Sequence, residues 1–410
     1  MGSYVIVGNG VAAIGCIEGI RSVDERGAIT VVSRERHPAY CRPLISYLLE
    51  GKTDLAHMPY RDAGFYERMG CTTLVGREAT RIDAEARAVE LDDGTRVAYD
   101  ALCLATGSSP FVPSFPGLDT VTSKHAFMTL DDALGLERAI DATSRVLIVG
   151  AGLIGLKCAE GICGRVLSIT VCDLADRVLS SILDAECAAL MQARLEGRGI
   201  RLMLGDTVER FEGDRAHMRG GEVVAFDVLV LAVGVRANTA LVGQVGGEVD
   251  RGVIVDDRMR TSLPDVFAAG DCAQGYDVSL GDKRVLAILP NAYLQGHAAG
   301  VNMAGGDERH DKGVPMNSIG FFGLHAMTAG TYAGEVYEER LEGSIRRLFV
   351  KDGLLRGFIL IGGDERAGIY TSLVRERIPL DSFDFDALRR GATTAAFPAG
   401  RRRQMFGEAV

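Results

Sequence analysis

The chain has 410 residues, of which 47% are hydrophobic and 24% charged, and this balance excludes an intrinsically disordered protein. It is too long for one core of ordinary size, so we expect two or three domains. The 45 basic and 55 acidic residues give a net charge of −10. That charge argues against nucleic acid as the main partner, because phosphate binding needs a basic face.

The N-terminal residues and the cysteines predict a cytoplasmic protein. Residues 4–7 are already a strand-like run with no basic, apolar leader before them, so we expect no signal peptide. The apolar runs are shorter than the ~20 residues that a membrane helix needs. Nine cysteines without a C-x-x-C pair favour reduced thiols, and the seven dispersed histidines give no metal-ligand spacing. We therefore expect neither a membrane span nor a metal site.

Glycine is the compositional outlier, at 51 residues without a repeat, and the first glycine motif lies between two predicted strands. A β-rich run at 4–7 leads into Gly-Asn-Gly-Val-Ala-Ala at 8–13, then a helical pattern, then a second strand at 28–32. A strand, a G-x-G-x-x-A turn, a helix and a strand in this order are typical of a dinucleotide-binding unit.

Each position of this turn has a physical role. Gly8 permits the sharp turn, and Gly10 lets a pyrophosphate approach the backbone at the helix N-terminus. Ala13 keeps the helix close to the sheet. Glu35 is the candidate ligand for a ribose hydroxyl, although it follows two residues after the expected end of the strand.

The same pattern recurs at residues 145–173. A strand at 145–149 precedes a glycine turn formed by Gly150, Gly152 and Gly155, and a helix and a second strand follow. Asp173 ends that strand, where a carboxylate binds an adenosine ribose and repels a 2′-phosphate. We therefore predict NADH rather than NADPH, a preference that the nearby Arg177 weakens. One turn should hold a tightly bound FAD and the other an exchangeable nicotinamide nucleotide.

With two such units, the chain resembles the pyridine nucleotide–disulfide oxidoreductases, which bind FAD and NAD(P)H. Four later segments carry the resemblance, including an A-T-G and an A-x-G-D motif: 104–110, 231–238, 267–273 and 291–304. The resemblance implies that the helix at 291–304 directs its N-terminus at the flavin and that Asp271 binds the ribityl chain. The other cofactor-binding residues that it implies are Ala105, Thr106, Gly107, Gly234 and Gly270.

The resemblance also implies an α/β fold with two Rossmann-like domains and a C-terminal α+β interface domain. The FAD domain is split between 1–110 and 240–310, and the NAD domain occupies 111–239. The interface domain covers 313–385, and 386–410 form a basic tail. Within the interface domain we predict a hairpin at 348–360, with a Lys-Asp-Gly turn, and a helix at 364–374.

The segment 37–47 indicates the branch of the family. It resembles the Y-x-R-P-x-x-S pattern of rubredoxin reductases, oxygenase-type ferredoxin reductases and the flavin module of nitrite reductases. The resemblance implies that Arg42 is a cation beside the pyrophosphate or the flavin. The C-x-x-x-x-C of glutathione and lipoamide reductases is absent, so a dithiol relay is excluded.

Two residues have competing interpretations. Cys41 aligns with the single reactive cysteine of coenzyme A-disulfide reductases and NADH oxidases, near a helix start that would lower its pKa. The alternative, which Arg-Pro after it favours, is a small residue without a redox role. Relatives place a lysine near flavin N5 at the position where this chain has Tyr47. The glutamate that partners this lysine in the relatives is replaced by Lys157 in this chain. Either the cation has moved to Lys157, or Lys157 faces solvent.

These features predict an FAD-dependent NADH:acceptor oxidoreductase. The chain has no iron–sulfur ligands, so the acceptor should be a separate iron–sulfur or rubredoxin-like protein. The chain is either a free-standing reductase or the flavin subunit of a hetero-oligomer in which NAD⁺ reduction is the physiological direction. The alternatives are a Cys41-dependent NADH oxidase or coenzyme A-disulfide reductase, and a non-catalytic flavoprotein assembly subunit.

The basic tail has two interpretations of its own. From residue 389 onward it carries five arginines against one glutamate: Arg389, Arg390, Arg401, Arg402, Arg403 and Glu408. It is either a loose tail or an arm that docks on an acidic partner.

Overall fold

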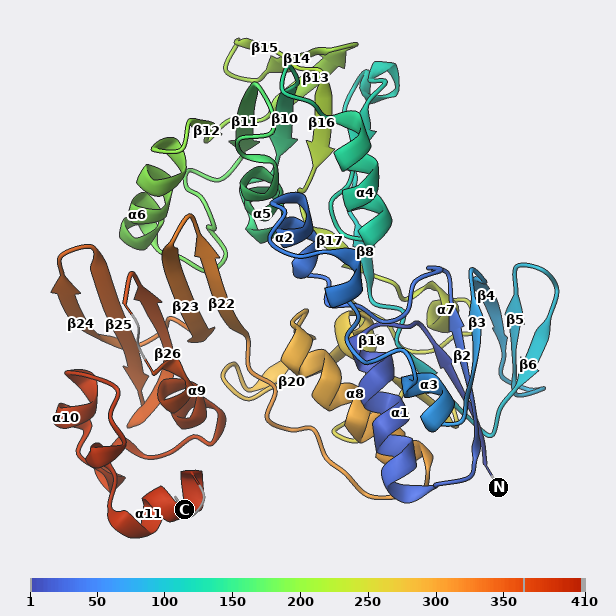
Figure 1. The fold of residues 1–410 in the computed structure, drawn as a ribbon. Helices are drawn as coiled ribbons and strands as arrows, with labels where there is room; N and C mark the ends of the chain where they lie inside the picture. Colours follow the sequence, from blue (N-terminus) through green and yellow to red (C-terminus); the bar gives the residue numbers. More distant parts are fainter. Residues whose placement is uncertain (1, 364–365, 407–410) are drawn as a thin grey trace.

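The computed structural model describes residues 2–363 and 366–406, which form three lobes (Figure 1). The first lobe is built on a five-stranded parallel sheet whose strand order is β19-β7-β1-β2-β3. These strands are β1 (Ser3–Val7), β2 (Ala28–Ser33), β3 (Cys71–Val75), β7 (Ala101–Leu104) and β19 (Val266–Ala268). The residues of β1 are apolar on both faces because both faces of the sheet are covered.

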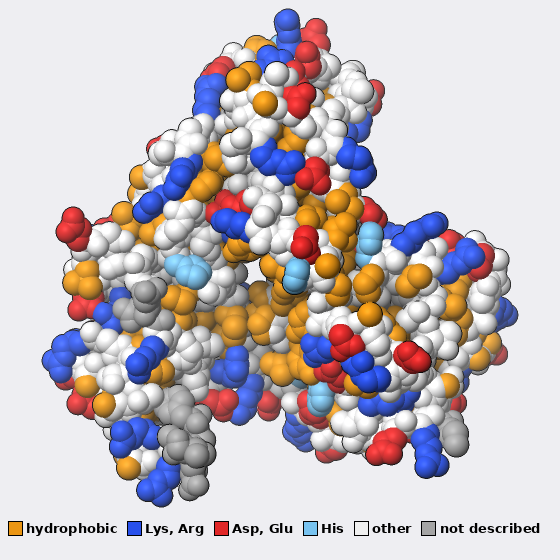
Figure 2. Space-filling model, in the orientation of Figure 1, with side chains coloured by type: hydrophobic (Ala, Val, Ile, Leu, Met, Phe, Trp, Pro, Cys, Tyr) orange, Lys and Arg blue, Asp and Glu red, His pale blue; other side chains and the backbone are white. Residues whose placement is uncertain are grey.

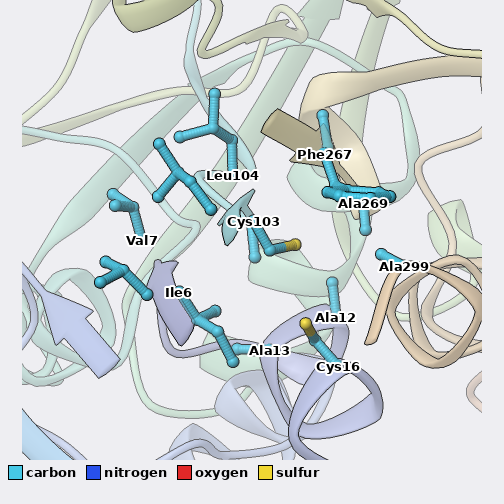
Figure 3. Packing of buried hydrophobic residues seen from close by; sticks show 14 of the residues in the cluster. Ile6, Val7, Ala12, Ala13, Cys16, Cys103, Leu104, Phe267, Ala269 and Ala299 are labelled. Carbon is cyan, nitrogen blue, oxygen red and sulfur yellow. The ribbon is translucent and has the colours of Figure 1, made fainter. Parts of the chain in front are cut away.

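Helices α1 (Val11–Val23) and α8 (Leu289–Met303) pack on one face of this sheet and cross each other closely (Figure 1). Figure 3 shows small side chains at this contact, among them Ala12 and Ala299. Four glycines lie at the crossing, and a Cβ on any of them would come within 2.0–2.3 Å of a backbone oxygen of the other helix: Gly15, Gly19, Gly296 and Gly300. Part of the glycine excess therefore serves helix packing rather than ligand binding.

The rest of the first lobe surrounds this core. An antiparallel sheet of β4 (Ala79–Asp83), β5 (Ala88–Leu91) and β6 (Arg96–Ala98) packs on the side away from α1 (Figure 1). The remaining elements are α2 (Leu44–Leu49), α3 (Phe65–Arg68), α7 (Ala240–Gly243), β18 (Val253–Ile254), β20 (Ala273–Asp277) and β21 (Asp282–Val285).

The second lobe repeats the architecture of the first. Its parallel sheet has the order β12-β11-β10-β16-β9. The strands are β9 (Lys124–His125), β10 (Arg145–Val149), β11 (Ser168–Asp173), β12 (Ile200–Leu204) and β16 (Val228–Leu231). Its helices are α4 (Leu130–Ala139), α5 (Leu153–Ile162) and α6 (Ala185–Glu196), and a small sheet is formed by β13 (Val208–Glu212), β14 (Arg215–Met218) and β15 (Val223–Ala225).

The chain passes between these two lobes along a pair of short strands. β8 (Ser108–Pro110) leaves the first lobe, and β17 (Val235–Ala237) returns to it, antiparallel to β8. Gly107 and Gly234 precede the two strands with φ values of +65° and +116°, which disfavour any residue with a side chain. The two lobes are therefore joined by a paired crossing rather than by one flexible linker.

The third lobe is an antiparallel sheet with the order β22-β23-β26-β25-β24. The strands are β22 (Met316–Phe321), β23 (Leu324–Gly330), β24 (Glu335–Leu341), β25 (Ser344–Lys351) and β26 (Leu354–Ile361). The predicted hairpin is confirmed, because Asp352 and Gly353 turn between β25 and β26 with φ of +55° and +68°. The predicted helix is α9 (Ala367–Arg375), and residues 364–365 lie outside the described residues.

The interpretation of residues 389–410 as a loose tail is wrong for the part up to Phe397. Helix α10 (Phe385–Arg389) and the segment up to Phe397 pack on the third lobe, with Leu388, Ala396 and Phe397 buried in its core. The apolar residues between the arginines provide this contact. Helix α11 (Ala399–Phe406) follows, and Arg402 and Arg403 are exposed on it.

Candidate functional site

The turn after β1 has the geometry that only glycine allows. Gly8 has a φ of +116°, and its N–H donates to the Val32 carbonyl at 2.8 Å. A Cβ on Gly8 would lie 2.0 Å from the carbonyl oxygen of Ala105. A Cβ on Gly10, in contrast, would meet no protein atom within 4 Å. The first glycine is thus required by the protein itself, whereas the second faces open space.

The turn after β10 has the same geometry. Gly150 has a φ of +117°, its N–H donates to the Cys172 carbonyl at 2.8 Å, and its Cβ would lie 2.2 Å from the Ala232 carbonyl oxygen. Gly152 faces open space, as Gly10 does. A Cβ on Gly155 would lie 2.0 Å from the Gly150 carbonyl oxygen, so this third glycine allows α5 to approach the turn.

Both turns fit a dinucleotide pyrophosphate. α1 and α5 each begin at a glycine, and neither helix has a side-chain cap on its first-turn N–H groups. These N–H groups need a partner, and the open space beside Gly10 and Gly152 lets a phosphate supply it. The two helix N-termini are therefore suited to one bound nucleotide each.

The acidic residue predicted for the first turn lies in a network of its own. Tyr40 donates its hydroxyl to Glu35 Oε2 at 2.7 Å, and Arg42 pairs with Glu35 Oε1. Arg42 also donates to the Met128 carbonyl at 3.1 Å, and the Leu130 N–H donates to the Tyr40 hydroxyl at 2.8 Å. Tyr40 was not expected to contribute, although it is the tyrosine of the Y-x-R-P pattern. The network fixes Glu35 and Arg42 beside the first lobe's nucleotide turn.

The acidic residue of the second turn is bound to the turn directly. Asp173 accepts hydrogen bonds from the N–H of Ala151 at 2.7 Å and of Ala175 at 2.8 Å. Arg177, the cation that could have favoured a 2′-phosphate, donates instead to Asp176 and to the Leu183 carbonyl. The carboxylate at the strand end is therefore held beside the turn, at the position where an NADH site has its ribose ligand.

Segments far apart in sequence complete the first site. The Ser108 hydroxyl donates to Asp271 Oδ2 at 3.3 Å, and a Cβ on Gly270 would lie 3.0 Å from Ala12 on the first turn of α1. Burial raises the pKa of the Asp271 carboxyl, while the Ser108 hydrogen bond and the Arg42 charge lower it in part. The A-x-G-D segment thus lies beside the first glycine turn.

Two amide side chains of this region were missed by the sequence analysis. Asn238 donates to the Thr106 carbonyl at 2.8 Å and accepts from Ser109 at 2.8 Å. These hydrogen bonds join the two chain segments that pass between the first and second lobes. Gln295 of α8 is buried and accepts from the Gly270 N–H at 2.9 Å. Both residues lie within segments that carried the resemblance, 231–238 and 291–304, and that position was their only signal.

Comparison with known proteins decides what these two sites belong to. The family profile described as pyridine nucleotide-disulphide oxidoreductase matches residues 2–296. The chain belongs to this family. It is therefore an FAD-dependent oxidoreductase of a nicotinamide nucleotide, with FAD and NADH as its cofactors, as predicted.

Two relatives and one solved structure illustrate the likeness. The chain is 33% identical over 390 residues to the NADH-dependent phenylglyoxylate dehydrogenase subunit epsilon of Aromatoleum evansii, and the match covers 92% of each chain. It is 30% identical over 387 residues to the assimilatory nitrate reductase electron transfer subunit of Bacillus subtilis, covering 91% of this chain and 49% of the relative. The reductase in the covalent putidaredoxin reductase–putidaredoxin complex has the same fold, with a TM-score of 0.85 at 22% identity over 92% of this chain and 94% of that one.

Lys157 lies where all three lobes of this flavoprotein meet. Its ammonium group donates to Glu160 Oε2 and to the Gly320 carbonyl, both at 2.6 Å. It also lies over the rings of Tyr47 and Phe321, at 5.1 and 4.8 Å from their centroids. The side chain is only 19% exposed, so Lys157 does not face solvent. Figure 2 shows a hollow at the meeting of the lobes, with hydrophobic side chains around it.

Cys41 lacks the surroundings of a reactive thiolate. Burial raises the pKa of its thiol more than the backbone of Leu44 lowers it. Leu44 is the first residue of helix α2, so the helix start does lower the pKa as the sequence suggested, but burial outweighs it.

The described residues offer few other redox groups. All nine cysteines are free, and six of them are fully buried in the cores of the first two lobes. In the described part of the chain, no group of three or more His, Cys, Asp or Glu side chains is arranged to hold a metal ion. Within 2–363 and 366–406, no helix is both long enough and apolar enough to cross a membrane.

Proposed function

We propose that this flavoprotein transfers electrons between NADH and a separate redox protein with an iron–sulfur or rubredoxin-like centre. The observation that carries the proposal is the pair of nucleotide turns, because one chain then holds both the nicotinamide nucleotide and the flavin that exchanges electrons with it. Two relatives named as subunits of larger enzymes support an onward protein acceptor. We further propose that the chain is the flavin subunit of such a complex, acts in the cytoplasm, and can work in the direction of NAD⁺ reduction.

The chain's own residues bind and orient the two nucleotides. FAD, when bound, supplies two-electron chemistry toward NADH and one-electron chemistry toward a metal centre. The N–H groups at the start of α1 would hold its pyrophosphate, and Asp271 and Arg42 would flank it. The start of α5 would hold the NADH pyrophosphate, and Asp173 would accept from its adenosine ribose. No general acid or base is needed for the transfer.

The decisive experiment is purification of the tagged chain from its own cells, with flavin, iron and co-purifying proteins measured on one sample. The proposal predicts one FAD per chain, rapid anaerobic bleaching by NADH, and a bound partner that contains iron. The arm interpretation of the C-terminus is tested in the same experiment with a chain that ends at Phe397, because the residues up to there are packed. Failure of NADH to bleach the flavin would contradict the proposal and favour an assembly role.

We also propose that Lys157 supplies the positive charge that relatives place at the position of Tyr47. Lys157→Gln should lower the flavin midpoint potential by about 30 mV, which for two electrons is about 1.4 kcal/mol. The reason is that a cation near the flavin stabilises its anionic reduced form. The potential is measured by dye equilibration.

Two further variants make this measurement specific. Lys52→Gln is the matched control, because Lys52 also lies over Tyr47, at 5.7 Å, but is 60% exposed and pairs with Glu50. Lys157→Arg should retain most of the potential. Equal potentials in the wild type and Lys157→Gln would show that Lys157 only joins the lobes.

Cys41→Ser tests the competing oxidase or disulfide-reductase function. Because burial raises the pKa of this thiol, it stays protonated at neutral pH, and we expect NADH turnover with a protein acceptor to change by less than about twofold. Steady-state assays with a protein acceptor, oxygen and coenzyme A disulfide measure this. Selective loss of the disulfide activity would instead favour a cysteine-dependent enzyme.

A further inference from the structure

The loop between β11 and α6 forms one wall of the NADH site. It starts at Asp173, whose carboxylate accepts from the Ala175 N–H within the loop. Midway, the Leu179 N–H donates to the carbonyl oxygen of Ala151, which belongs to the glycine turn itself. Leu179 is buried with a φ of +52°, a strained conformation that persists only where the surroundings impose it. The position of the loop therefore depends on what holds its far end.

The third lobe holds that far end. The Tyr332 hydroxyl, between β23 and β24, donates to the Ile182 carbonyl at 2.8 Å. Arg347 of β25 pairs through its two terminal nitrogens with Asp184 and Glu186. Asp184 is also the N-cap of α6, where it accepts from the Cys187 N–H at 3.0 Å. Figure 1 shows α6 directly beside the sheet of the third lobe.

Within its own sheet, Arg347 uses only part of its guanidinium group, to pair with Glu338 of the neighbouring strand β24. Its Nε pairs with Glu338 at 2.6 Å, and the side chain is only 13% exposed. Arg340 pairs with the same two glutamates, Glu186 and Glu338, so the five charged groups form one interlobe network. A buried arginine is tolerated when carboxylates satisfy all its donor directions, and two of the three carboxylates come from the NADH lobe.

We propose that Arg347 and Tyr332 are positioning residues for NADH, acting on the nucleotide turn through the loop 174–184. The inference rests on the proposed function, because it assigns NADH to the second turn. Neither side chain reaches the turn, and their effect passes through Ile182 and Asp184 at one end of the loop to the Leu179–Ala151 hydrogen bond. NADH affinity is thus set partly by a lobe that contains no nucleotide motif.

The test compares Arg347→Gln with Arg346→Gln, its neighbour in β25. Arg346 is buried to a similar degree, at 8% exposed, but its guanidinium bonds to Glu339 and to Tyr370 of α9 and so lies on the opposite side of the sheet. Arg347→Gln should raise the KM for NADH and the Kd for ADP-ribose about tenfold, with kcat and FAD content changed by less than about twofold. Arg346→Gln should leave both binding constants unchanged, even where it lowers thermal stability.

Tyr332→Phe keeps the test informative if Arg347→Gln does not fold. It removes one oxygen and one hydrogen bond, and it should weaken ADP-ribose binding about threefold. Added salt should weaken binding more in the wild type than in Arg347→Gln, because the variant lacks the Arg347 ion pairs and keeps only those of Arg340 in this network. Unchanged ADP-ribose affinity in both variants would overturn the inference.

The outcome is separable from that of the proposed function. If NADH fails to bleach the wild-type flavin, the proposed function is wrong, whereas ADP-ribose titration of the same variants still reports on the loop. If the wild type is bleached and the variants bind ADP-ribose normally, only the inference about Arg347 and Tyr332 is wrong.

Discussion

The two glycine turns of this protein have nearly the same backbone but different surroundings. Gly8 and Gly150 differ by 1° in φ, and each donates a 2.8 Å hydrogen bond to the neighbouring strand. A Cβ added to Gly8 would clash with the carbonyl oxygen of Ala105, and a Cβ added to Gly150 would clash with that of Ala232. Both carbonyl groups lie just after the strand on the other side of the turn. The glycine spacing therefore determines the turn, independently of the lobe that contains it.

The elements that surround the two turns differ, as the proposed retention of FAD at one turn and release of NADH at the other would require. On the first lobe, α8 packs tightly on α1 and the A-x-G-D segment closes over the turn beside Ala12. On the second lobe, the turn is held by Asp173 and by a loop that depends on the third lobe. Equal turns can thus serve a resident cofactor and an exchanging substrate, because the elements packed on them differ.

The strongest test of this comparison replaces the first glycine of each turn with alanine. Gly8→Ala and Gly150→Ala each combine a positive φ with a carbonyl contact near 2 Å, and each should cost about 3 kcal/mol or more locally. Because the first turn is built into the main core, Gly8→Ala should abolish FAD binding and lower the Tm of the whole protein. Gly150→Ala should keep its FAD and lose NADH binding. Flavin content and NADH titration measure both effects.

A matched pair separates backbone strain from ligand contact. Gly10→Ala and Gly152→Ala introduce no clash with the protein, so both should fold with unchanged Tm while their respective nucleotides bind weakly. If Gly8→Ala and Gly150→Ala had the same effect on FAD, the two turns would not be independent.

The next prediction concerns the stability of the first lobe at acid pH. His310 is buried and donates from Nε2 to Asn291 Oδ1 at 2.9 Å, which holds the first turn of α8. Burial lowers the pKa of His310 to about 4, and Asp311 and Glu308 offset the shift only in part. Between pH 6.5 and 4 the unfolded chain binds the proton that the folded chain excludes, so stability falls by up to about 3 kcal/mol as the pH falls through this window.

Urea unfolding at pH 7 and pH 4.5, followed by FAD release, measures this loss. His310→Gln should flatten the pH dependence. His297→Gln, on α8, is the control, because His297 is partly exposed and pairs with Glu308. An unchanged slope in His310→Gln would assign the acid sensitivity to other groups.

The smallest expected effect concerns nucleotide choice at the second turn. Asp173→Asn removes the charge while keeping the shape, so NADH affinity should fall about tenfold and the discrimination against NADPH should decrease. KM values for both nucleotides check this. Asp176→Asn is the control, because Asp176 is exposed and pairs with Arg177 on this loop. If Asp173→Asn still discriminated against NADPH, the nucleotide specificity would have to come from Arg177 or from the loop.

Local patterns predicted the parts of the fold that depend on local chemistry. The two strand–turn–helix units, the β25–β26 hairpin and the parallel sheets follow from apolar runs separated by glycines, since each constraint acts within about ten residues. The tail was misjudged for the same reason. Leu388 and Phe397 are separated by polar and small residues, and only packing against the third lobe shows them to be core.

The contacts between lobes lie beyond such patterns. Nothing in the sequence around Lys157 indicates that it bonds to Gly320, and nothing around Arg347 indicates Asp184. These pairs are more than 150 residues apart, so no local periodicity relates them. The network of Tyr40, Glu35 and Arg42 is intermediate, because the three residues are close in sequence but need Met128 and Leu130 to be held in place.

The sequence by itself determined that this protein binds two dinucleotides, because a bare backbone at Gly8, Gly10, Gly150 and Gly152 is a local requirement of phosphate binding at a helix N-terminus. Only the tertiary structure decided how each turn is enclosed, where Lys157 lies, and which lobe contacts the loop after β11. The physical reason is that burial, ion pairing and the resulting pKa values depend on which distant segments fold against one another.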